Sequence, residues 1–333
     1  MFHCERRTMP NCVLVFLFLV LFSAPAFAVP QANQPKERHF EFEYSGAVQE
    51  VPFGAQVRVW IPLAYSNADQ EIVDLKTKLP NGSRQTTEQV HGNRMVYFEC
   101  ASSDGSPIPF RLNYEVLRKE LNSMRRNLDL EISQEQRQVY SMPNRLVPIE
   151  GRPTALLDNT NLDGSPFQTA RSLYDLVEKY MTYDKSKPGY GNGDVLWACD
   201  SKTGNCTDFH SLFISLARSQ KIPAFFEIGF PLPANQGEGS VGGYHCWAKF
   251  FVEGQGWIPV DISEADKDPK MKEYFFGNLT ENRIGFTRGR DVNLEPRQKS
   301  EPLNYFVFPH VEVDGKVWPK EKISLQFQFR DLE

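Results

Sequence analysis

The residue best suited to chemistry in this chain is a cysteine at the predicted start of a helix. Cys206 follows Asn205, a favourable N-cap residue, and Asp208 can reach back to complete a capping box. The residues after it place apolar side chains on one helical face: Phe209, Leu212, Phe213, Leu216 and Ala217. A thiol at the first helical position lies at the positive end of the helix dipole, which favours thiolate and lowers the pKa of the cysteine. We therefore interpret Cys206 as an activated nucleophile.

A histidine and an aspartate further along the chain can complete such a site. Residues 244–251 and 257–261 are rich in aromatic and β-branched side chains, and a glycine-bearing turn joins them, which is typical of a β-hairpin. If residues 252–254 form a three-residue loop, His245 lies directly opposite Asp261. Their Cβ atoms would then be about 5 Å apart, so the carboxylate could accept the imidazole N–H and fix its tautomer. A register slip by one residue would separate the two side chains.

The same residues carry a resemblance to a known family. The order Cys, His, Asp occurs within G-N-C-T-D-F-H at 204–210, G-Y-H-C-W-A-K-F at 243–250 and G-W-I-P-V-D at 256–261. With these motifs the chain resembles the bacterial transglutaminase-like superfamily, which is related to the papain-like cysteine proteases. The resemblance covers about residues 165–261, and the flanking regions resemble exported members that carry an N-terminal β domain.

The resemblance implies a fold and three roles. The implied fold class is α+β, with a transglutaminase/papain-like catalytic core, in which the cysteine helix packs on an antiparallel sheet, and an N-terminal β sandwich. Cys206 would be the nucleophile, His245 the general base and then acid, and Asp261 the group that orients the histidine. Lys249 departs from the pattern, because family members often have an acidic residue there, and this change concerns substrate preference.

The chemistry implied by this triad is acyl transfer through a thioester on Cys206. Water would resolve the acyl-enzyme in a peptidase, amidase or deamidase, which is our first expectation, whereas an amine would do so in a crosslinking transglutaminase. The substrate is expected to be a peptide or protein, and no cofactor is needed. The oxyanion hole should use the Cys206 backbone N–H and a second donor from Trp197, Asn205 or another main-chain amide. Trp197 could equally fill the core.

Two other function classes remain open. Cys206 and His210 lie one helical turn apart, and His245 and Cys246 add two more donors, so a structural zinc site is arithmetically possible. Adjacent residues on a strand point to opposite faces, so His245 and Cys246 should not both reach one ion, and we expect no metal. In the third class the protein is a non-catalytic module that binds peptide or glycan.

The first 28 residues have the pattern of a cleavable signal peptide. Arg6 and Arg7 precede an apolar run over 13–22, and Ala26-Phe27-Ala28 forms a small-residue cleavage site. The run is shorter than the roughly 20 residues of a spanning helix, so we expect cleavage after Ala28 and no membrane association beyond the export signal. The protein would be periplasmic or secreted. A net charge of −5 gives no electrostatic reason to expect nucleic acid as a partner. The oligomeric state stays open.

The spacing of apolar residues changes along the remaining chain and divides it into regions. Alternating apolar residues and turn signals over 37–118 predict an N-terminal β-sandwich domain, followed by a connecting segment over 119–160. Helical spacing begins at Ser165-Pro166, so the catalytic domain is predicted over 161–333, and its last part is a C-terminal β extension.

Two loops and three cysteines complete the sequence-based expectations. The glycine-bearing segment 188–194 is expected to be a flexible approach to the cysteine, and the polar loop 231–243 is either a lid over the thiol or an ordinary exposed loop. Cys100, Cys199 and Cys246 would remain after export, and we expect them to be buried small hydrophobes rather than disulfide partners.

Overall fold

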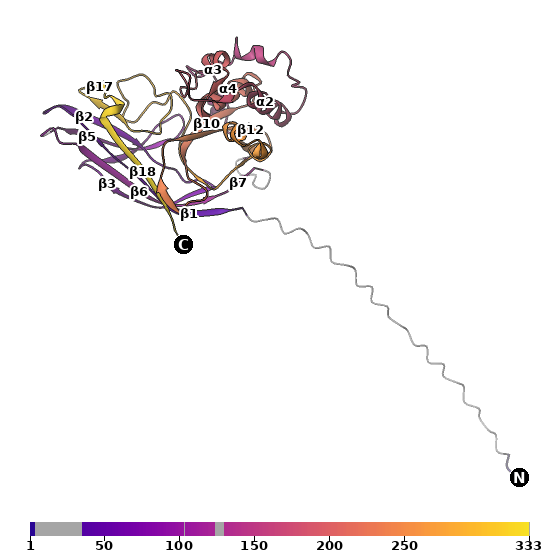
Figure 1. The fold of residues 1–333 in the computed structure, drawn as a ribbon. Coiled ribbons are helices and arrows are strands. Elements are labelled where there is room, and N and C mark those ends of the chain that lie inside the picture. The colour runs from indigo at the N-terminus through magenta and orange to yellow at the C-terminus, as the bar shows by residue number, and fades with distance from the viewer. Residues whose placement is uncertain (4–34, 103, 124–129, 333) are drawn as a thin grey trace. The chain divides into compact units, whose positions relative to one another are not determined.

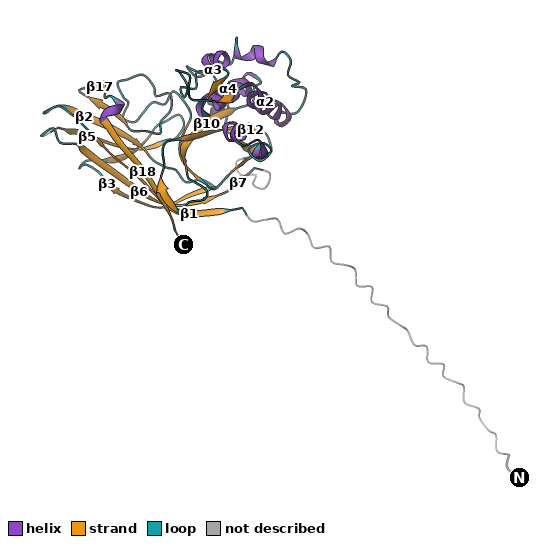
Figure 2. Ribbon diagram, in the orientation of Figure 1, coloured by secondary structure: helices purple, strands orange, loops and turns teal. Residues whose placement is uncertain are grey.

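Strands dominate the fold, and the longer helices gather around one of its sheets. The computed structural model describes residues 1–3, 35–102, 104–123 and 130–332 (Figure 1), so most of the predicted signal peptide lies outside the described residues. Figure 2 shows the helices around β10 (Ala224–Pro231) and β12 (His245–Val252). The helices are α1 (Gln134–Val139), α2 (Pro166–Tyr180), α3 (Val195–Ser201), α4 (Cys206–Ser219) and α5 (Ile262–Lys267), with 3-10 turns at Pro153–Leu157, Pro269–Met271 and Lys320–Lys322.

Two five-stranded sheets contain the strands predicted over 37–118. The first has the order β11 (Glu238–Ser240), β18 (Ile323–Asp331), β1 (Glu37–Val48), β6 (Ile108–Lys119), β3 (Gln70–Lys78). The second has the order β17 (Lys316–Val317), β16 (His310–Val313), β2 (Gln56–Pro62), β5 (Arg94–Ala101), β4 (Arg84–Thr87). Alternate residues of β1, including Phe40, Phe42 and Tyr44, are fully buried, as the period of two predicts. The N-terminal region is thus rich in strands.

The C-terminal β extension completes these two sheets rather than the sheet that carries His245. β18 pairs antiparallel with β1, so that Phe329 lies beside Phe42, and β16 pairs with β2. Figure 1 shows the C-terminal β18 running beside the N-terminal β1. Residues 35–333 accordingly form one compact unit. Strands from the two ends of the chain therefore share one hydrogen-bonded framework.

The segment 231–243, for which the sequence allowed either a lid or an exposed loop, contributes the edge strand of the first sheet. Within 231–243, residues 238–240 form β11, and Glu238 pairs with Arg330 of β18. Arg38 also donates hydrogen bonds to the backbone oxygens of Pro233 (3.0 Å) and Gln236 (2.8 Å). The lid interpretation was wrong, because backbone pairing and the buried Arg38 attach this segment to the first sheet.

A four-stranded antiparallel sheet supports the candidate site. Its order is β13 (Gly256–Val260), β12, β10, β15 (Arg283–Arg288), and α4 packs on β12 and β10. Every residue of α4 from Cys206 to Arg218 is buried. Two short pairs complete the topology: β7 (Leu121–Asn122) with β14 (Asn278–Leu279), and the parallel β8 (Thr182–Tyr183) with β9 (Thr203–Gly204). The result is an α+β fold in which a buried helix lies on an antiparallel sheet.

The β12–β13 hairpin exists, but its register differs from the prediction. Val252 pairs with Gly256 and Ala248 with Val260, so the loop is 253–255 and each residue pairs two positions further along than expected. His245 is therefore not opposite Asp261 in the ladder. A shift of two residues keeps the same side chains on each face, which is why the hairpin still buries the predicted residues.

Candidate active site

Cys206 occupies the first position of α4, and the predicted cap is present. The Asn205 side chain accepts the Thr207 backbone N–H at 2.8 Å, and Asp208 Oδ2 accepts the Asn205 backbone N–H at 2.9 Å. Both halves of the capping box are formed. The cysteine itself is only 2% exposed. Its thiol therefore lies in a low-dielectric environment at the positive end of a helix.

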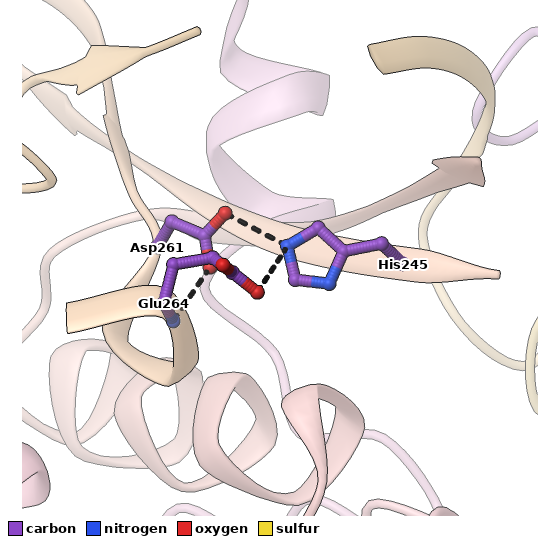
Figure 3. Close-up of side chains that lie close together, drawn as sticks. All are labelled: His245, Asp261 and Glu264. Atoms are coloured by element: carbon purple, nitrogen blue, oxygen red, sulfur yellow. Dashed lines mark hydrogen bonds and ion pairs between the residues drawn. The ribbon is translucent and has the colours of Figure 1, made fainter. Parts of the chain in front are cut away.

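His245 and Asp261 meet at the end of the hairpin. His245 Nε2 lies 2.8 Å from Asp261 Oδ2, and Figure 3 shows the two side chains pointing toward each other. His245 is the first residue of β12, whereas Asp261 follows β13 and caps α5 by accepting the Glu264 backbone N–H. The predicted contact is thus present, although it depends on the cap of α5 rather than on direct strand opposition.

The charge of the His245 side chain also acts on the Cys206 thiol. Because Asp261 engages Nε2, the remaining ring nitrogen, Nδ1, is the one available to the sulfur. The His245 imidazole therefore interacts electrostatically with both the thiol and the carboxylate.

The electrostatics of the three groups favour a thiolate–imidazolium pair. Burial would raise the pKa of Cys206, but hydrogen bonds from Cys246 and His245 and the His245 charge bring that pKa well below its ordinary value. Burial would lower the pKa of His245, but the Asp261 charge and hydrogen bond, with Cys206, raise it to about 10. Burial also opposes ionisation of Asp261, yet His245 and Arg283 hold its pKa well below the usual range. The pKa shifts of all three groups therefore favour their charged forms.

Two further charged side chains contact the proposed catalytic residues, and the sequence motifs did not predict them. Arg283 Nη1 donates to Asp261 Oδ2 at 3.0 Å, and Glu264 Oε1 lies 4.0 Å from His245 Nε2 (Figure 3 shows Glu264). Glu264 follows Asp261 at the spacing of a capping box, so helix-start signals could have found it. Arg283 lies 22 residues beyond Asp261 on β15, and no local pattern marks it.

Cys246 and His210 lie beside Cys206 in an arrangement the sequence did not predict. Cys246 Sγ is 3.6 Å from His210 Nδ1 and 3.8 Å from Thr207 Oγ1, and burial and the Cys206 charge raise the pKa of the Cys246 thiol. His245 and Cys246 are adjacent on β12, where they pair with Gly229 and Ile228 of β10, and both act electrostatically on Cys206.

The proposed zinc ligands do not form a cluster that could share an ion. In the part of the chain that the structure describes, the one His, Cys, Asp and Glu group with ligand atoms within 4.8 Å of one another is His245, Asp261 and Glu264. His210 Nε2 instead accepts the Ile262 backbone N–H at 3.0 Å, and burial lowers the pKa of His210 to about 4. His210 is thus a neutral group that joins α4 to the start of α5.

The two side chains suggested for the oxyanion hole have other contacts. The Asn205 amide donates to the Tyr244 hydroxyl at 3.2 Å, in addition to capping α4. Trp197 is half-buried on α3, packs against the core, and has its indole against Gly189, where an added Cβ would lie 2.7 Å from Nε1. Gly189 has a φ of +101°, so both space and backbone conformation require glycine.

The approach segment 188–194 is fastened by hydrogen bonds, whereas we expected it to be flexible. The Asp208 carboxylate accepts the backbone N–H groups of Gly191 (2.7 Å) and Gly193 (2.9 Å). On the other side, the buried Arg290 donates to the backbone oxygens of Asn192 (2.7 Å) and Gly193 (3.2 Å). These contacts fix the segment against the start of α4.

Lys249 and the remaining cysteines occupy structural positions. Lys249 Nζ lies 3.0 Å from Glu227 Oε2, and both side chains are buried. Glu227 also accepts Tyr65 and Trp247, and although burial opposes ionisation, Lys249, Arg288 and Tyr65 lower the pKa of Glu227 to about 2. All four described cysteines from residue 100 on are free; Cys199 and Cys246 are buried as expected, whereas Cys100 is only half-buried.

Comparison with known proteins agrees with the fold and with the site motifs. Residues 154–262 match the model of the transglutaminase-like superfamily, and this range contains Cys206, His245 and Asp261. These residues form a transglutaminase-like domain. An uncharacterized protein of Haemophilus influenzae is 27% identical over 308 residues, which is 80% of this chain and 83% of that protein. The similarity to that protein therefore extends well beyond the residues that match the family model.

Solved structures also resemble this chain. A candidate cysteine protease from Cytophaga hutchinsonii aligns over 89% of this chain and 99% of its own, with a TM-score of 0.56 and 13% identity. The periplasmic domain of TgpA from Pseudomonas aeruginosa covers 71% of this chain and 90% of its own, with a TM-score of 0.37 and 16% identity. The first likeness extends the shared fold beyond the transglutaminase-like domain to the strands around it. The family match and the fold support a cysteine-dependent enzyme.

The described residues contain no helix that is long and apolar enough to cross a membrane.

Proposed function

We propose that this protein is a cysteine-dependent acyl-transfer enzyme that hydrolyses amide bonds of peptides or proteins. The observation that carries the proposal is the buried pairing of His245 with Asp261 at 2.8 Å, together with a buried Cys206 thiol at the start of α4 on which the His245 charge acts. A thiolate at a helix N-terminus, with a histidine held in one orientation by a carboxylate, is the arrangement that nucleophilic catalysis by cysteine requires.

In the proposed reaction, the Cys206 thiolate attacks the carbonyl carbon of the amide. The oxygen takes up the negative charge and is stabilised by the Cys206 backbone N–H and a second donor, for which Trp197, Asn205 and other main-chain amides are candidates. When the tetrahedral intermediate collapses, the imidazolium of His245 gives its proton to the departing amine or ammonia, and a thioester remains on Cys206. The neutral imidazole then takes a proton from water, which attacks the thioester and releases the acid.

Asp261 has an orienting role in this scheme. Its carboxylate accepts the Nε2 proton of His245, which keeps Nδ1 directed at the sulfur and stabilises the imidazolium. The low pKa of the buried Asp261 carboxyl means that it stays ionised and does not take the proton itself. We also propose that residues 1–28 direct the chain out of the cytoplasm and that the enzyme acts in the periplasm or after secretion.

The test is a glutamine-containing peptide library incubated with the mature protein, with and without a primary amine, and analysed by mass spectrometry. Cleavage or deamidation in water supports the hydrolase. Incorporation of the amine in place of hydrolysis would instead assign a crosslinking transglutaminase. Cys206→Ala is the control, because it removes the nucleophile from a helix whose other contacts remain. Full turnover by Cys206→Ala, or none by the wild-type protein, would contradict the proposal.

A further inference from the structure

Arg283 is a buried cation in direct contact with the proposed triad. It begins β15, is 4% exposed, and its Nη1 donates to the same Asp261 oxygen that accepts His245 Nε2. The two donors approach Asp261 Oδ2 to 3.0 Å and 2.8 Å. Asp261 Oδ1 faces other partners, namely Ser263 Oγ at 3.3 Å and the Glu264 backbone N–H at 3.4 Å. Arg283 and His245 thus hold one carboxylate oxygen between them.

The other contacts of Arg283 do not explain its burial. Its guanidinium lies over the Trp247 ring, 4.9 Å from the centroid, and Nη2 reaches Thr280 Oγ1 only at 3.5 Å. Nε is buried without a hydrogen-bond partner. Burying an arginine with an unsatisfied N–H is costly, and the Asp261 carboxylate, 3.0 Å from Nη1, offsets this cost. Such a costly buried charge is expected where a residue has a functional role rather than a purely structural one.

Arg283 completes an alternation of charge along the site. In the proposed ion-pair state, the charged groups are, in order, the Cys206 thiolate, the His245 imidazolium, the Asp261 carboxylate and the Arg283 guanidinium. Each group lies next to a group of opposite charge, and the four charges sum to zero. Without Arg283, the same buried groups would carry one net negative charge, which would oppose formation of the thiolate.

Other titratable groups around these four leave this balance in place. Glu264 pairs with Lys267 at 2.7 Å, and His210, whose Nε2 is 3.7 Å from Asp261 Oδ1, is neutral above about pH 4. Other groups act at longer range: Cys246 and Tyr174 on Asp261, Arg118 and Tyr274 on Arg283, and Asp208, Tyr244 and Tyr305 on Cys206. The charge of Arg118 is offset by Asp69. Burial raises the pKa values of Cys246, Tyr174 and Tyr274, so these three are neutral at pH 7.

We propose that Arg283 is a positioning residue that holds the Asp261 carboxylate against His245 and balances its charge, so that thiolate and imidazolium form together. This inference rests on the proposed function, since it assigns Arg283 a role in activating Cys206. Arg283 acts through Asp261 and His245.

The test measures the reactivity of the thiol without any substrate. Iodoacetamide alkylation of Cys206 is followed by mass spectrometry from about pH 4 to pH 9 in the wild type, Arg283→Gln, Arg283→Lys and Arg288→Gln. Arg288 is the matched control, because it lies on the same strand and covers the Tyr65 ring at 5.1 Å without contacting the triad. Thermal melts establish that each variant is folded, and Arg283→Met replaces Arg283→Gln if the glutamine variant does not fold.

We expect Arg283→Gln to shift the acidic limb of the rate–pH profile of Cys206 alkylation by about one unit toward higher pH. At a fixed pH on that limb, the alkylation rate should fall about tenfold. Arg283→Lys should recover most of that rate, and Arg288→Gln should match the wild type. A folded Arg283→Gln protein with an unchanged profile would overturn the inference even if its turnover fell, because a structural role alone does not move the thiol titration. A wild-type Cys206 that alkylates only at alkaline pH would instead contradict the proposed function.

Discussion

Asp261 does more at the residue scale than orient a histidine. The same carboxylate accepts His245 and Arg283 through one oxygen and caps α5 through the other. Its position is therefore fixed from three directions, and the histidine it holds has little freedom to turn away from the sulfur. The cap of α5 and the activation of Cys206 depend on one side chain.

Replacing Asp261 by asparagine should therefore slow acylation in the folded protein. An amide can present N–H instead of oxygen to His245 Nε2, which would favour the wrong tautomer of the imidazole. We expect a loss of about 100-fold to 10,000-fold in kcat/KM, measured with whichever peptide the library identifies. Glu264→Gln is the control, because the Glu264 carboxylate lies 4.0 Å from His245 Nε2. This substitution should lower kcat/KM by less than about tenfold. Equal effects of the two substitutions would argue against the role of Asp261.

The pKa directions predict a wide pH range for the reactive thiolate. The lowered pKa of Cys206 means that the thiolate is lost only as the pH falls through that low value. The imidazolium is lost as the pH rises through about 10. Alkylation of Cys206 should hence be fast already in mildly acidic buffer. Cys100 is an internal control, since burial raises the pKa of its thiol and it should react only in alkaline buffer. A common pH profile for both cysteines would contradict this prediction.

Local sequence signals were sufficient to predict the parts of the site that depend on residues close together in the sequence. The cap at Asn205 and Asp208 and the burial of α4 follow from residue type and spacing over one helix. The predicted hairpin register was wrong by two residues, because the three-residue loop occupies 253–255 rather than 252–254, and the turn chemistry suits either position. Arg283 could not be predicted, because its contact with Asp261 depends on the pairing of β15 with β10. Long-range pairing is invisible to local periodicity.

At the scale of elements, the start of α4 and the approach segment form one structure through Asp208. Its carboxylate accepts three backbone N–H groups, from Asn205, Gly191 and Gly193, and is fully buried. Burial raises the pKa of this carboxyl, and the three N–H groups oppose the increase. One side chain thus caps the cysteine helix and holds the loop that lies beside the cap.

Asp208→Ala should consequently destabilise the protein and loosen the approach segment. Three buried N–H groups would lose their acceptor, so we expect a loss of about 3 kcal/mol in the free energy of unfolding, measured by urea denaturation. Hydrogen exchange at Gly191 and Gly193 should also accelerate. Asp184→Ala is the matched control, because Asp184 accepts the Ser186 N–H at the surface and should change stability by less than about 0.5 kcal/mol. Unchanged exchange at both glycines would contradict the assignment.

At the scale of the whole described unit, aromatic rings join the N-terminal and C-terminal strands to the sheet that carries His245. Phe327 of β18 lies 4.3 Å from Phe230 of β10 and 4.8 Å from Tyr44 of β1, centroid to centroid. Phe286 of β15 contacts Phe42, Tyr44 and Phe230 as well. The sequence predicted alternation in each strand, but it could not predict which strands share this core, because their positions differ by up to nearly the length of the chain.

This shared core predicts that the sheets unfold together. Phe327→Ala should cost about 3 to 5 kcal/mol, because it removes a buried ring that packs on both the first sheet and the His245 sheet. Gln326→Ala is the matched control on the same strand, where the side chain is exposed, and it should change stability by less than about 0.5 kcal/mol. Circular dichroism and Cys206 alkylation, followed through the same urea titration, should shift to lower urea by the same amount in Phe327→Ala. If the dichroism transition moved while the alkylation transition did not, the strands and the transglutaminase-like domain would be separate folding units.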